Sequence, residues 1–448
     1  NRIYKNILWG VKGNYRSIPT DCPQRDERQG WLGDRGGESR GESYLFDVAA
    51  FYNKWMVDIK DSQKDSGSIP DVAPAYWPIY SDNTTWPGCY IIIPGTLYEQ
   101  YGDMEVLRNH YPSMKKWVNY MKVYIKDNIM TKDTYGDWCV PPESQELIHS
   151  QDPNRRTVAE VIGTCYFYHE LKLMARYAKL LGQGVDAKEF GELAEKMKVA
   201  FNEKYFNKDK FQYDNGSQTS SVLPLAFGMV PEEHKSKVFD KLVDKILVEG
   251  KGHIGTGLIG AQWLMRVLSD NGRPDVAYKI ATQKTYPSWG YMIENGATTI
   301  WELWNGNTAD PAMNSHNHVM LVGDLCTWMH EYLAGIRQGA GSVGFKKIVI
   351  DPVIVGDLTS AHSCYKSQYG RIFSDWKIEG EQLALKVVIP VNTTATVYVP
   401  AEKVENVTES GKAAVKSQGL KFLQMEDGKA VFSAGSGEYK FVSTLPPS

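Results

Sequence analysis

Apolar side chains recur at intervals of three and four residues through most of the chain, a spacing that predicts amphipathic helices. The first such helix is indicated by Ile3, Ile7 and Leu8. Clear repeats follow over residues 45–59, 107–125, 171–181, 190–201 and 238–246, and further helices are expected near 256–269, 274–284 and 318–335. Serial helix pairs of roughly 50 residues are what a toroid of helical hairpins requires.

The pattern changes near Gly339, Ala340 and Gly341. Beyond this point, residues 347–350, 383–389 and 394–399 are β-rich and lie between Gly, Asn and Pro breaks. We therefore expect a mainly helical domain over 1–338 and a β domain over 339–448. Long loops rich in Gly, Pro and Trp are expected at 67–95 and 286–315, and such loops on a rigid scaffold often carry binding and catalytic residues.

Composition excludes several classes of protein. The chain has 50 Lys and Arg against 53 Asp and Glu, a net charge of −3, which argues against a nucleic-acid binder. No apolar run reaches the roughly 18 residues that a membrane-spanning helix needs. The six cysteines form no Cys-x-x-Cys pair and no cluster with zinc-ligand spacing, so neither a metal nor another cofactor is predicted. Aromatic residues reach 12%, which suits either a large core or stacking on sugar rings.

Two segments concentrate groups that could perform chemistry. Residues 20–34 hold four carboxylates, two arginines and Trp31, with glycines on both sides of that tryptophan. The ordinary interpretation is a solvated charged loop, but carboxylates beside an aromatic ring also suit a sugar site. In residues 296–305, Glu302 lies between Trp301 and Trp304. Apolar neighbours make a carboxyl group's protonation tunable, although an acid near Trp is also common in cores.

These segments resemble the signatures of glycoside hydrolase family 78, the α-L-rhamnosidases. The first match is Thr20-Asp21-Cys22-Pro23-Gln24-Arg25-Asp26-Glu27-Arg28, followed by Gly30-Trp31 and Gly33-Asp34. The second runs from Tyr286-Pro287-Ser288-Trp289-Gly290 through Gly296-Ala297-Thr298-Thr299-Ile300-Trp301-Glu302. Gly136-Asp137-Trp138 and Asn314 with Asn317-His318 resemble two further motifs of the family.

The resemblance implies an (α/α)6 barrel that carries the active site, followed by a C-terminal β-sandwich. It implies inverting hydrolysis of terminal α-L-rhamnose from oligosaccharides, polysaccharides or glycosides, with Glu27 as general acid and Glu302 as general base. It requires no cofactor. The substrate-binding candidates are Asp21, Arg25, Trp31, Asp34, Asp137, Trp138, Trp301, Trp304 and His318.

The sequence also departs from the family pattern. Leu303 stands where many members have Arg, and no acid lies within Trp86-Pro87-Gly88-Cys89, where many have Asp. A helical-barrel glycosidase for another sugar, or a sugar-binding module without activity, therefore stays open as an alternative. The β domains that usually precede the barrel are absent, which suggests a fragment. The compartment is not encoded in the sequence, although a soluble periplasmic or extracellular protein is favoured over a cytoplasmic one.

Overall fold

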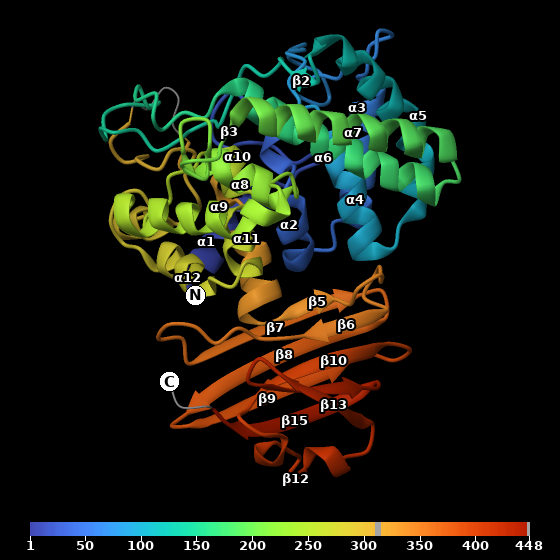
Figure 1. Ribbon diagram of the computed structural model, residues 1–448, viewed down its shortest axis with the longest axis vertical. Coiled ribbons are helices and arrows are strands. Elements are labelled where there is room, and N and C mark those ends of the chain that lie inside the picture. The colour runs from blue at the N-terminus through green and yellow to red at the C-terminus, as the bar shows by residue number, and fades with distance from the viewer. Residues whose placement is uncertain (310–314, 446–448) are drawn as a thin grey trace. The chain divides into compact units, whose positions relative to one another are not determined.

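The computed structural model describes residues 1–309 and 315–445, and the chain divides into two compact units (Figure 1). The helical unit comprises Asn1–Glu42, Val48–Thr96 and Met104–Cys326. The β unit comprises Ser43–Asp47, Leu97–Asp103 and Thr327–Ser448. In the described part of the chain, no helix is both long and apolar enough to cross a bilayer.

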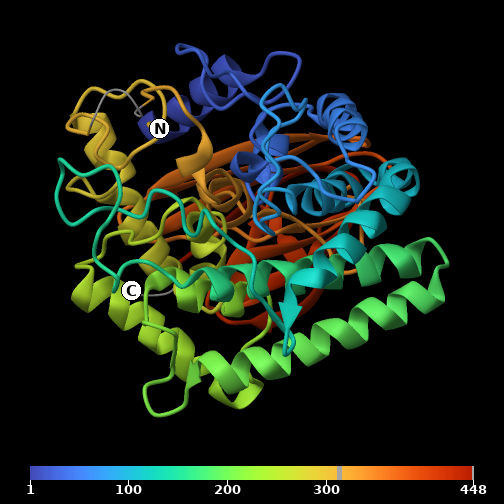
Figure 2. The ribbon, with the colours of Figure 1, turned by 90° about the horizontal axis from the view of Figure 1, so that it is seen from above.

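Helices alternate with loops through the first three quarters of the chain. Their bounds are α1 (Arg2–Asn14), α2 (Ser39–Leu45), α3 (Ala49–Asp61), α4 (Cys89–Tyr101), α5 (Met104–Met121), α6 (Ala159–Leu180), α7 (Gly184–Tyr205), α8 (Gln218–Ala226), α9 (Lys235–Asp244), α10 (Leu258–Ala261), α11 (Leu264–Asp270), α12 (Pro274–Thr282), α13 (Trp289–Glu294) and α14 (Leu325–Trp328). Seen from above, the helices coloured from blue to yellow follow one another round a ring (Figure 2), as expected for a helical toroid.

The hairpin of α6 and α7 shows how the sequence builds this ring. Leu171, Met174 and Ala178 on α6 are buried, as is the matching stripe of Phe190, Ala194, Met197 and Phe201 on α7. Each large apolar side chain that is fully buried contributes about 1.5–3 kcal/mol. The predicted stop at Gly182 is confirmed, because this residue has φ +74° and its N–H donates to Lys179 O at 3.2 Å.

Other predicted bounds were wrong. The helix predicted over 107–125 ends at Met121, and Ile125 instead opens the short strand β1 (Ile125–Lys126), which pairs with β2 (Ile129–Met130). The loop expected over 67–95 includes the start of α4, and the loop expected over 286–315 contains α13.

The helix expected over 318–335 is interrupted once. A short turn of helix, Met320–Val322, comes before the break, and after it α14 continues directly into Met329–Leu333. The break falls at Gly323, which has φ +58° and where a Cβ would lie 2.4 Å from Ala261 O. This close approach of two backbones interrupts the predicted helix, because it excludes a side chain at that position.

The β unit consists of two main sheets. The five-stranded sheet has the order β13-β14-β10-β6-β5, and the six-stranded sheet has the order β12-β11-β15-β9-β8-β7. Their bounds are β5 (Ile336–Gln338), β6 (Lys347–Ile350), β7 (Ser360–Ser367), β8 (Gly370–Glu379), β9 (Gln382–Ile389), β10 (Thr394–Pro400), β11 (Thr408–Glu409), β12 (Lys412–Ala413), β13 (Leu420–Glu426), β14 (Lys429–Ala434) and β15 (Gly437–Thr444). A further small hairpin, β3 (Phe206–Asn207) with β4 (Gln212–Tyr213), lies in the helical unit.

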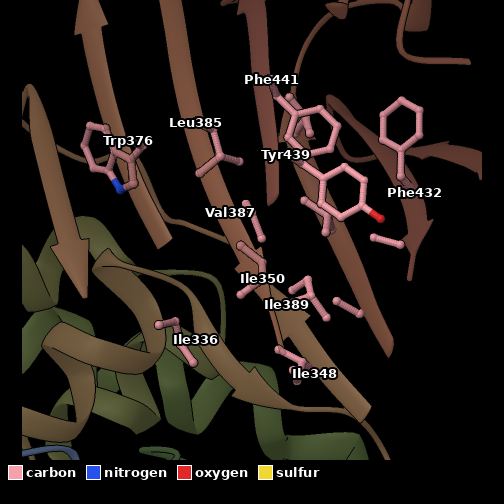
Figure 3. Packing of buried hydrophobic residues seen from close by; sticks show 14 of the residues in the cluster. Ile336, Ile348, Ile350, Trp376, Leu385, Val387, Ile389, Phe432, Tyr439 and Phe441 are labelled. Carbon is pink, nitrogen blue, oxygen red and sulfur yellow. The ribbon is translucent and has the colours of Figure 1, made fainter. Parts of the chain in front are cut away.

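The two main sheets share one apolar core, which makes the β unit a sandwich (Figure 3). Alternate residues of β9, namely Leu385, Val387 and Ile389, point inward with Tyr439 and Phe441 of β15. From the other sheet, Ile348, Ile350 and Phe432 join the same cluster. The predicted strands are therefore confirmed. The exact domain boundary near 338 stays a prediction.

Candidate active site

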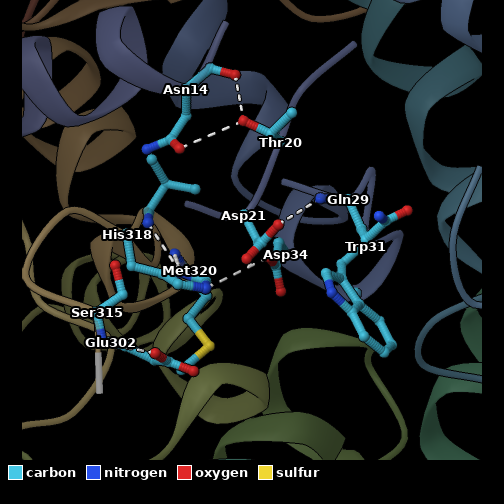
Figure 4. A network of polar contacts seen from close by, with 12 residues as sticks. Asn14, Thr20, Asp21, Gln29, Trp31, Asp34, Glu302, Ser315, His318 and Met320 are labelled. Atoms are coloured by element: carbon cyan, nitrogen blue, oxygen red, sulfur yellow. Dashed lines mark hydrogen bonds and ion pairs between the residues drawn. The ribbon is translucent and has the colours of Figure 1, made fainter. Parts of the chain in front are cut away.

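The charged segment of residues 20–34 folds as a closed loop rather than a helix. At its base, Asp21 N donates to Gln29 O at 3.0 Å, and Gln29 N donates back to Asp21 Oδ1 at 2.6 Å (Figure 4). Asp21 is buried, and this burial raises the pKa of its carboxyl. The backbone and side chain of Asp21 both bond to Gln29 and so close the loop. This closure restricts the position of Glu27, which lies within the loop.

Trp31 is held against Glu27 by a short backbone pairing. Leu32 N donates to Asp71 O at 2.9 Å, and Ala73 N donates to Gly30 O at 3.0 Å. A Cβ on Gly30 would lie 2.3 Å from Ala73 O, which explains the glycine beside Trp31. The half-buried Trp31 donates from its indole Nε1 to Glu27 Oε1 at 2.7 Å.

Glu302 is held by the segment that follows it. Its backbone N donates to Ser315 O at 2.9 Å, and Ser315 N donates to Glu302 Oε2 at 2.8 Å. Burial raises the pKa of Glu302 to about 7, and hydrogen bonds from Arg25 and Ser315 oppose this rise. Ser315 also accepts a hydrogen bond from Gln24 at 2.6 Å, so it ties the two candidate segments together.

Arg25 joins the two predicted catalytic carboxylates. Its Nη2 lies 2.7 Å from Glu27 Oε2, its Nη1 lies 2.9 Å from Glu302 Oε2, and its Nη2 lies 3.3 Å from Glu302 Oε1. Because Nη2 contacts both acids, Glu27 Oε2 and Glu302 Oε1 lie at most about 6 Å apart. The structure thus brings together two acids that are far apart in sequence.

His318 and Asp34 form a second polar pair beside these acids. His318 Nδ1 accepts hydrogen bonds from Val319 N at 3.0 Å and Met320 N at 3.2 Å, so the ring proton is on Nε2. Burial holds the pKa of His318 well below its usual value and keeps the ring neutral. Its Nε2 is 3.9 Å from Asp34 Oδ2, which is buried and accepts no hydrogen bond from the described residues. A neutral donor and an open acceptor suit the hydroxyl groups of a sugar.

Asp137 has a different environment from the one that the sequence predicted. Its two carboxylate oxygens accept hydrogen bonds from Thr219 Oγ1 and from the backbone N–H groups of Gly257, Ile259 and Gly260. Four protein donors leave little capacity for a sugar hydroxyl. We therefore assign Asp137 to anchoring its loop. Asp137 and Trp138 both line a cavity, but the Asp137 carboxylate is already held by these donors.

One of the two tryptophans beside Glu302 also differs from the prediction. Trp304 is 1% exposed and packs edge to face on Trp289, with 5.5 Å between ring centroids. Trp301 is 3% exposed and lies against His316. Trp304 belongs to the core around Glu302, and burial of this kind desolvates the acid. Trp301 is no more buried than His318 and Glu302, so its contact with a sugar stays a prediction. Asn314 of the matched motif lies outside the described residues.

One cluster has the residue types of a metal site. Ligand atoms of Asp21, Cys22 and Glu27 lie within 4.8 Å of one another, although the sequence spacing indicated no such set. Burial, followed by the hydrogen bond with Asp21, raises the pKa of the Cys22 thiol far above its usual value. A protonated thiol is a poor metal ligand, so the chemistry of this cluster does not favour a metal.

Comparison with known proteins identifies the family. The model of the bacterial α-L-rhamnosidase six-hairpin glycosidase domain matches residues 1–333, and that of the bacterial α-L-rhamnosidase C-terminal domain matches residues 335–414. The chain belongs to the bacterial α-L-rhamnosidase family. The expected (α/α)6 barrel is therefore the six-hairpin domain of this family, and a C-terminal β-sandwich follows it.

Individual relatives agree with this assignment. An α-L-rhamnosidase of Formosa agariphila is 36% identical over 98% of the chain, which covers 47% of that protein. A solved α-L-rhamnosidase from Dictyoglumus thermophilum aligns with a TM-score of 0.90 at 38% identity, over 99% of this chain and 49% of that one. The Streptomyces avermitilis α-L-rhamnosidase in complex with L-rhamnose aligns with a TM-score of 0.90 at 34% identity, over 99% and 41%. The chain thus spans less than half the length of these family members.

Sequence reasoning missed several residues that shape this α-L-rhamnosidase-like site. Asp71 accepts hydrogen bonds from Ser81 and Tyr135, and the Tyr135 ring lies tilted against Trp86 with 4.4 Å between ring centroids. Buried Arg35 donates to Thr20 O and pairs with Glu42 at 3.1 Å beneath the loop. Of these residues, only Ser315 could have been found from the sequence, because it lies inside the matched Asn-Ser-x-Asn-His motif. The others lie in stretches whose spacing indicated only loops or helices.

Proposed function

We propose that the helical unit is the catalytic part of an enzyme that releases terminal α-L-rhamnose from oligosaccharides, polysaccharides or glycosides. The observation that carries this proposal is the placement of Glu27 and Glu302 on one guanidinium in a chain of this family. A pair of carboxyl groups is what glycoside hydrolysis requires. The L-rhamnose complex of the S. avermitilis relative supports the choice of sugar.

In the proposed mechanism, Glu27 is the general acid. It gives its proton to the glycosidic oxygen while the bond from that oxygen to the anomeric carbon breaks. The indole N–H of Trp31 orients the carboxyl group through Oε1. Arg25 pairs with Glu27, so this ion pair has to open before Glu27 can act as an acid.

Glu302 is the general base of the same mechanism. It takes a proton from water as the water oxygen attacks the anomeric carbon from the opposite face, and the product has the inverted configuration. Ser315 N and Arg25 orient the carboxylate for this step. Both groups hydrogen-bond the ionised form, which is the form that a base requires.

The remaining polar and aromatic groups bind the sugar in this proposal. His318 donates from Nε2 and Asp34 accepts at Oδ2, so each can take one sugar hydroxyl. Trp31 and Trp138 are the half-buried tryptophans of the predicted set, and their faces suit the methyl group and the C–H bonds of a 6-deoxy sugar. The predicted periplasmic or extracellular location is kept as part of this proposal.

Hydrolysis of aryl glycosides by the 448-residue chain tests the proposal. We expect release of L-rhamnose from an aryl α-L-rhamnoside, and loss of this activity in Glu27→Gln and Glu302→Gln. Glu294→Gln is the control, because Glu294 is exposed and its nearest ion-pair partner is Lys284 at 3.7 Å. Proton NMR of the first product should show β-L-rhamnose.

Three results would argue against the proposal. Turnover of a different sugar in an aryl glycoside panel would favour the other helical-barrel glycosidases. Binding of rhamnose without turnover would favour the sugar-binding module. An α-anomer as the first product would exclude inversion.

A further inference from the structure

A cavity of about 750 Å³ lies beside Trp138. Residues 134–140, most of 149–159 and Asn215 line it, and neither Glu27 nor Glu302 is among the lining residues. Cavities that bind small molecules typically measure about 300–1,000 Å³, so this one has room for a sugar ring. It is therefore separate from the acid pair and large enough for a second part of the substrate.

A row of rings connects this cavity with the candidate active site. Trp86 packs so closely on the residue before Asp34 that a Cβ on Gly33 would lie 2.3 Å from its ring. From Trp86, ring centroids follow at 4.4 Å to Tyr135, 6.0 Å from there to Trp138, and 4.7 Å from Trp138 to His149. Trp86 is buried, so this row packs the cavity wall against the segment that carries Asp34, and the rings that line the cavity itself are Tyr135, Trp138 and His149.

The environment of Cys139 also indicates that the cavity lies near the candidate active site. It lines the cavity, and its pKa is raised by burial first and then by the charges of Glu302 and Asp34. The cavity wall therefore lies within electrostatic range of the predicted base.

The charges around the cavity are uneven. The one carboxylate among the described lining residues, Asp137, is already held by four donors. Burial, helped by the charge of Arg156, lowers the pKa of His149, so that ring is neutral near pH 7. The carboxylates bonded to lining residues from just outside the cavity are already engaged: Glu143 accepts from Ser150 and Gln151 N, Asp152 from Asn154, Asp133 from Gly136 N and Asp214 from Val158 N.

Arg155 and Arg156 are neighbours in sequence but differ in their contacts. Arg155 is 3.6 Å from Asp152 and donates to Pro141 O, and it lines a different cavity. Arg156 lines the cavity beside Trp138, is exposed, and its guanidinium has no hydrogen bond or ion pair with another described residue. A guanidinium has planar donors that fit the oxygens of a carboxylate or a sulfate.

We propose that this cavity binds an anionic sugar on the leaving-group side of the cleaved bond, with Arg156 binding its carboxylate or sulfate group. The inference rests on the proposed function and names its substrate class, which is rhamnosyl-linked acidic glycans. The ring of this sugar packs along Trp138 and His149. A neutral sugar can make the same ring contacts but leaves the Arg156 charge unpaired.

The test uses the 448-residue chain and three disaccharides with the same linkage: α-L-rhamnosyl-glucuronate, α-L-rhamnosyl-glucose and the sulfate ester of the latter. We expect the wild-type kcat/KM to be about fivefold or more higher for an anionic disaccharide than for the neutral one. Arg156→Gln should remove this preference without changing the rate on the neutral disaccharide. Arg155→Gln should keep it. A higher rate on the glucuronate disaccharide would indicate a carboxylate site, and a higher rate on the sulfate ester would indicate a sulfate site.

Each other result has a defined meaning. Equal rates on neutral and anionic disaccharides, or equal losses in the two arginine variants, would overturn the proposal while rhamnoside cleavage still stands. If no rhamnoside is cleaved, the proposed function fails, and titration of tryptophan fluorescence with α-L-rhamnosyl-glucuronate decides the cavity's role separately. Binding that Arg156→Gln abolishes would support the anionic site, and absence of binding by the wild type would refute it.

Discussion

At the scale of single residues, Arg25 has the most consequential position. It lies two residues from Glu27 in sequence and 277 from Glu302, yet its guanidinium contacts both carboxylates. Two acids that approach each other repel when both are ionised, and a cation between them removes most of that cost. Arg25 therefore lowers the pKa of the buried Glu302, which burial raises.

The pH dependence of activity should report on this arrangement. The pKa of Glu302 is about 7, and a general base must be ionised, so kcat/KM should rise as pH increases through about 7. Arg25 lowers that pKa, so Arg25→Gln should shift the acidic limb of the profile to higher pH in the residual rate. Arg108→Gln is the control, because Arg108 is exposed on α5 and pairs with Glu105. An acidic limb that stays in place in Arg25→Gln would show that another group titrates.

Trp31 offers a second test at this scale. Trp31→Phe keeps an aromatic face but removes the N–H that donates to Glu27 Oε1. Hydrogen bonds to charged groups contribute about 1.5–3 kcal/mol, so kcat/KM should fall roughly 10- to 100-fold with little change in melting temperature. Trp77→Phe, whose ring meets Trp31 edge to face at 6.3 Å, should be nearly neutral. Equal losses in both variants would mean that ring packing rather than the hydrogen bond matters.

At the scale of elements, short backbone pairings rather than long helices place the catalytic side chains. Residues 30–32 pair with 71–73, and Ile300 pairs with His318. In both pairings the partners are at least 18 residues apart along the chain. The helices form the ring, and these pairings set the direction of Trp31 and Glu302.

Gly30→Ala tests the first pairing. Because the new Cβ would meet the carbonyl oxygen of Ala73 at 2.3 Å, the two backbones must separate. Overpacking of this kind costs about 1–3 kcal/mol, and activity should fall with stability because Trp31 moves. Urea unfolding and kcat/KM measure the two effects. Gly191→Ala on α7 is the matched control: no atom lies within 4 Å of its Cβ, and alanine should stabilise the helix by about 1 kcal/mol.

At the scale of the whole molecule, the chain consists of two units that draw on separate parts of the sequence. The β unit includes Ser43–Asp47 and Leu97–Asp103 from the otherwise helical region. Within it, His330 bonds to Ser363 at 2.7 Å and stacks on Tyr44 with 4.9 Å between ring centroids. Burial, and then the charge of His362, lowers the pKa of His330 to about 4.

Because His330 is buried and neutral, we expect the β unit to lose stability at acidic pH. The unfolded chain takes up a proton on His330 near pH 6.5, whereas the folded chain does so only near pH 4. The stability that neutral His330 contributes is therefore complete above pH 6.5 and falls by up to about 3 kcal/mol as pH drops to 4. Urea unfolding at pH 7.5 and 4.5 should show this loss, and His330→Gln should reduce it. His234→Gln, at a partly exposed position of the helical unit, should leave it unchanged.

The sequence by itself determined the local elements and the chemistry of the site. Apolar spacing is a local property, so it found α6, α7 and the strands β6, β9 and β10, and the long signature around Glu27 identified the family. Positions where the chain must turn against a distant backbone, such as Gly323, carry no local signal, so the interruption of the helix predicted over 318–335 could not be foreseen.

Only the tertiary structure decided which polar groups are free to act. Asp137 and Trp304 matched or neighboured the family motifs, but packing surrounds the Asp137 carboxylate with donors and buries Trp304 in the core. Packing also placed Arg25 between two acids and left Arg156, but not Arg155, on the cavity beside Trp138. The physical reason is that hydrogen-bond capacity and desolvation depend on neighbours in space, and these neighbours come from segments that lie far apart along the chain.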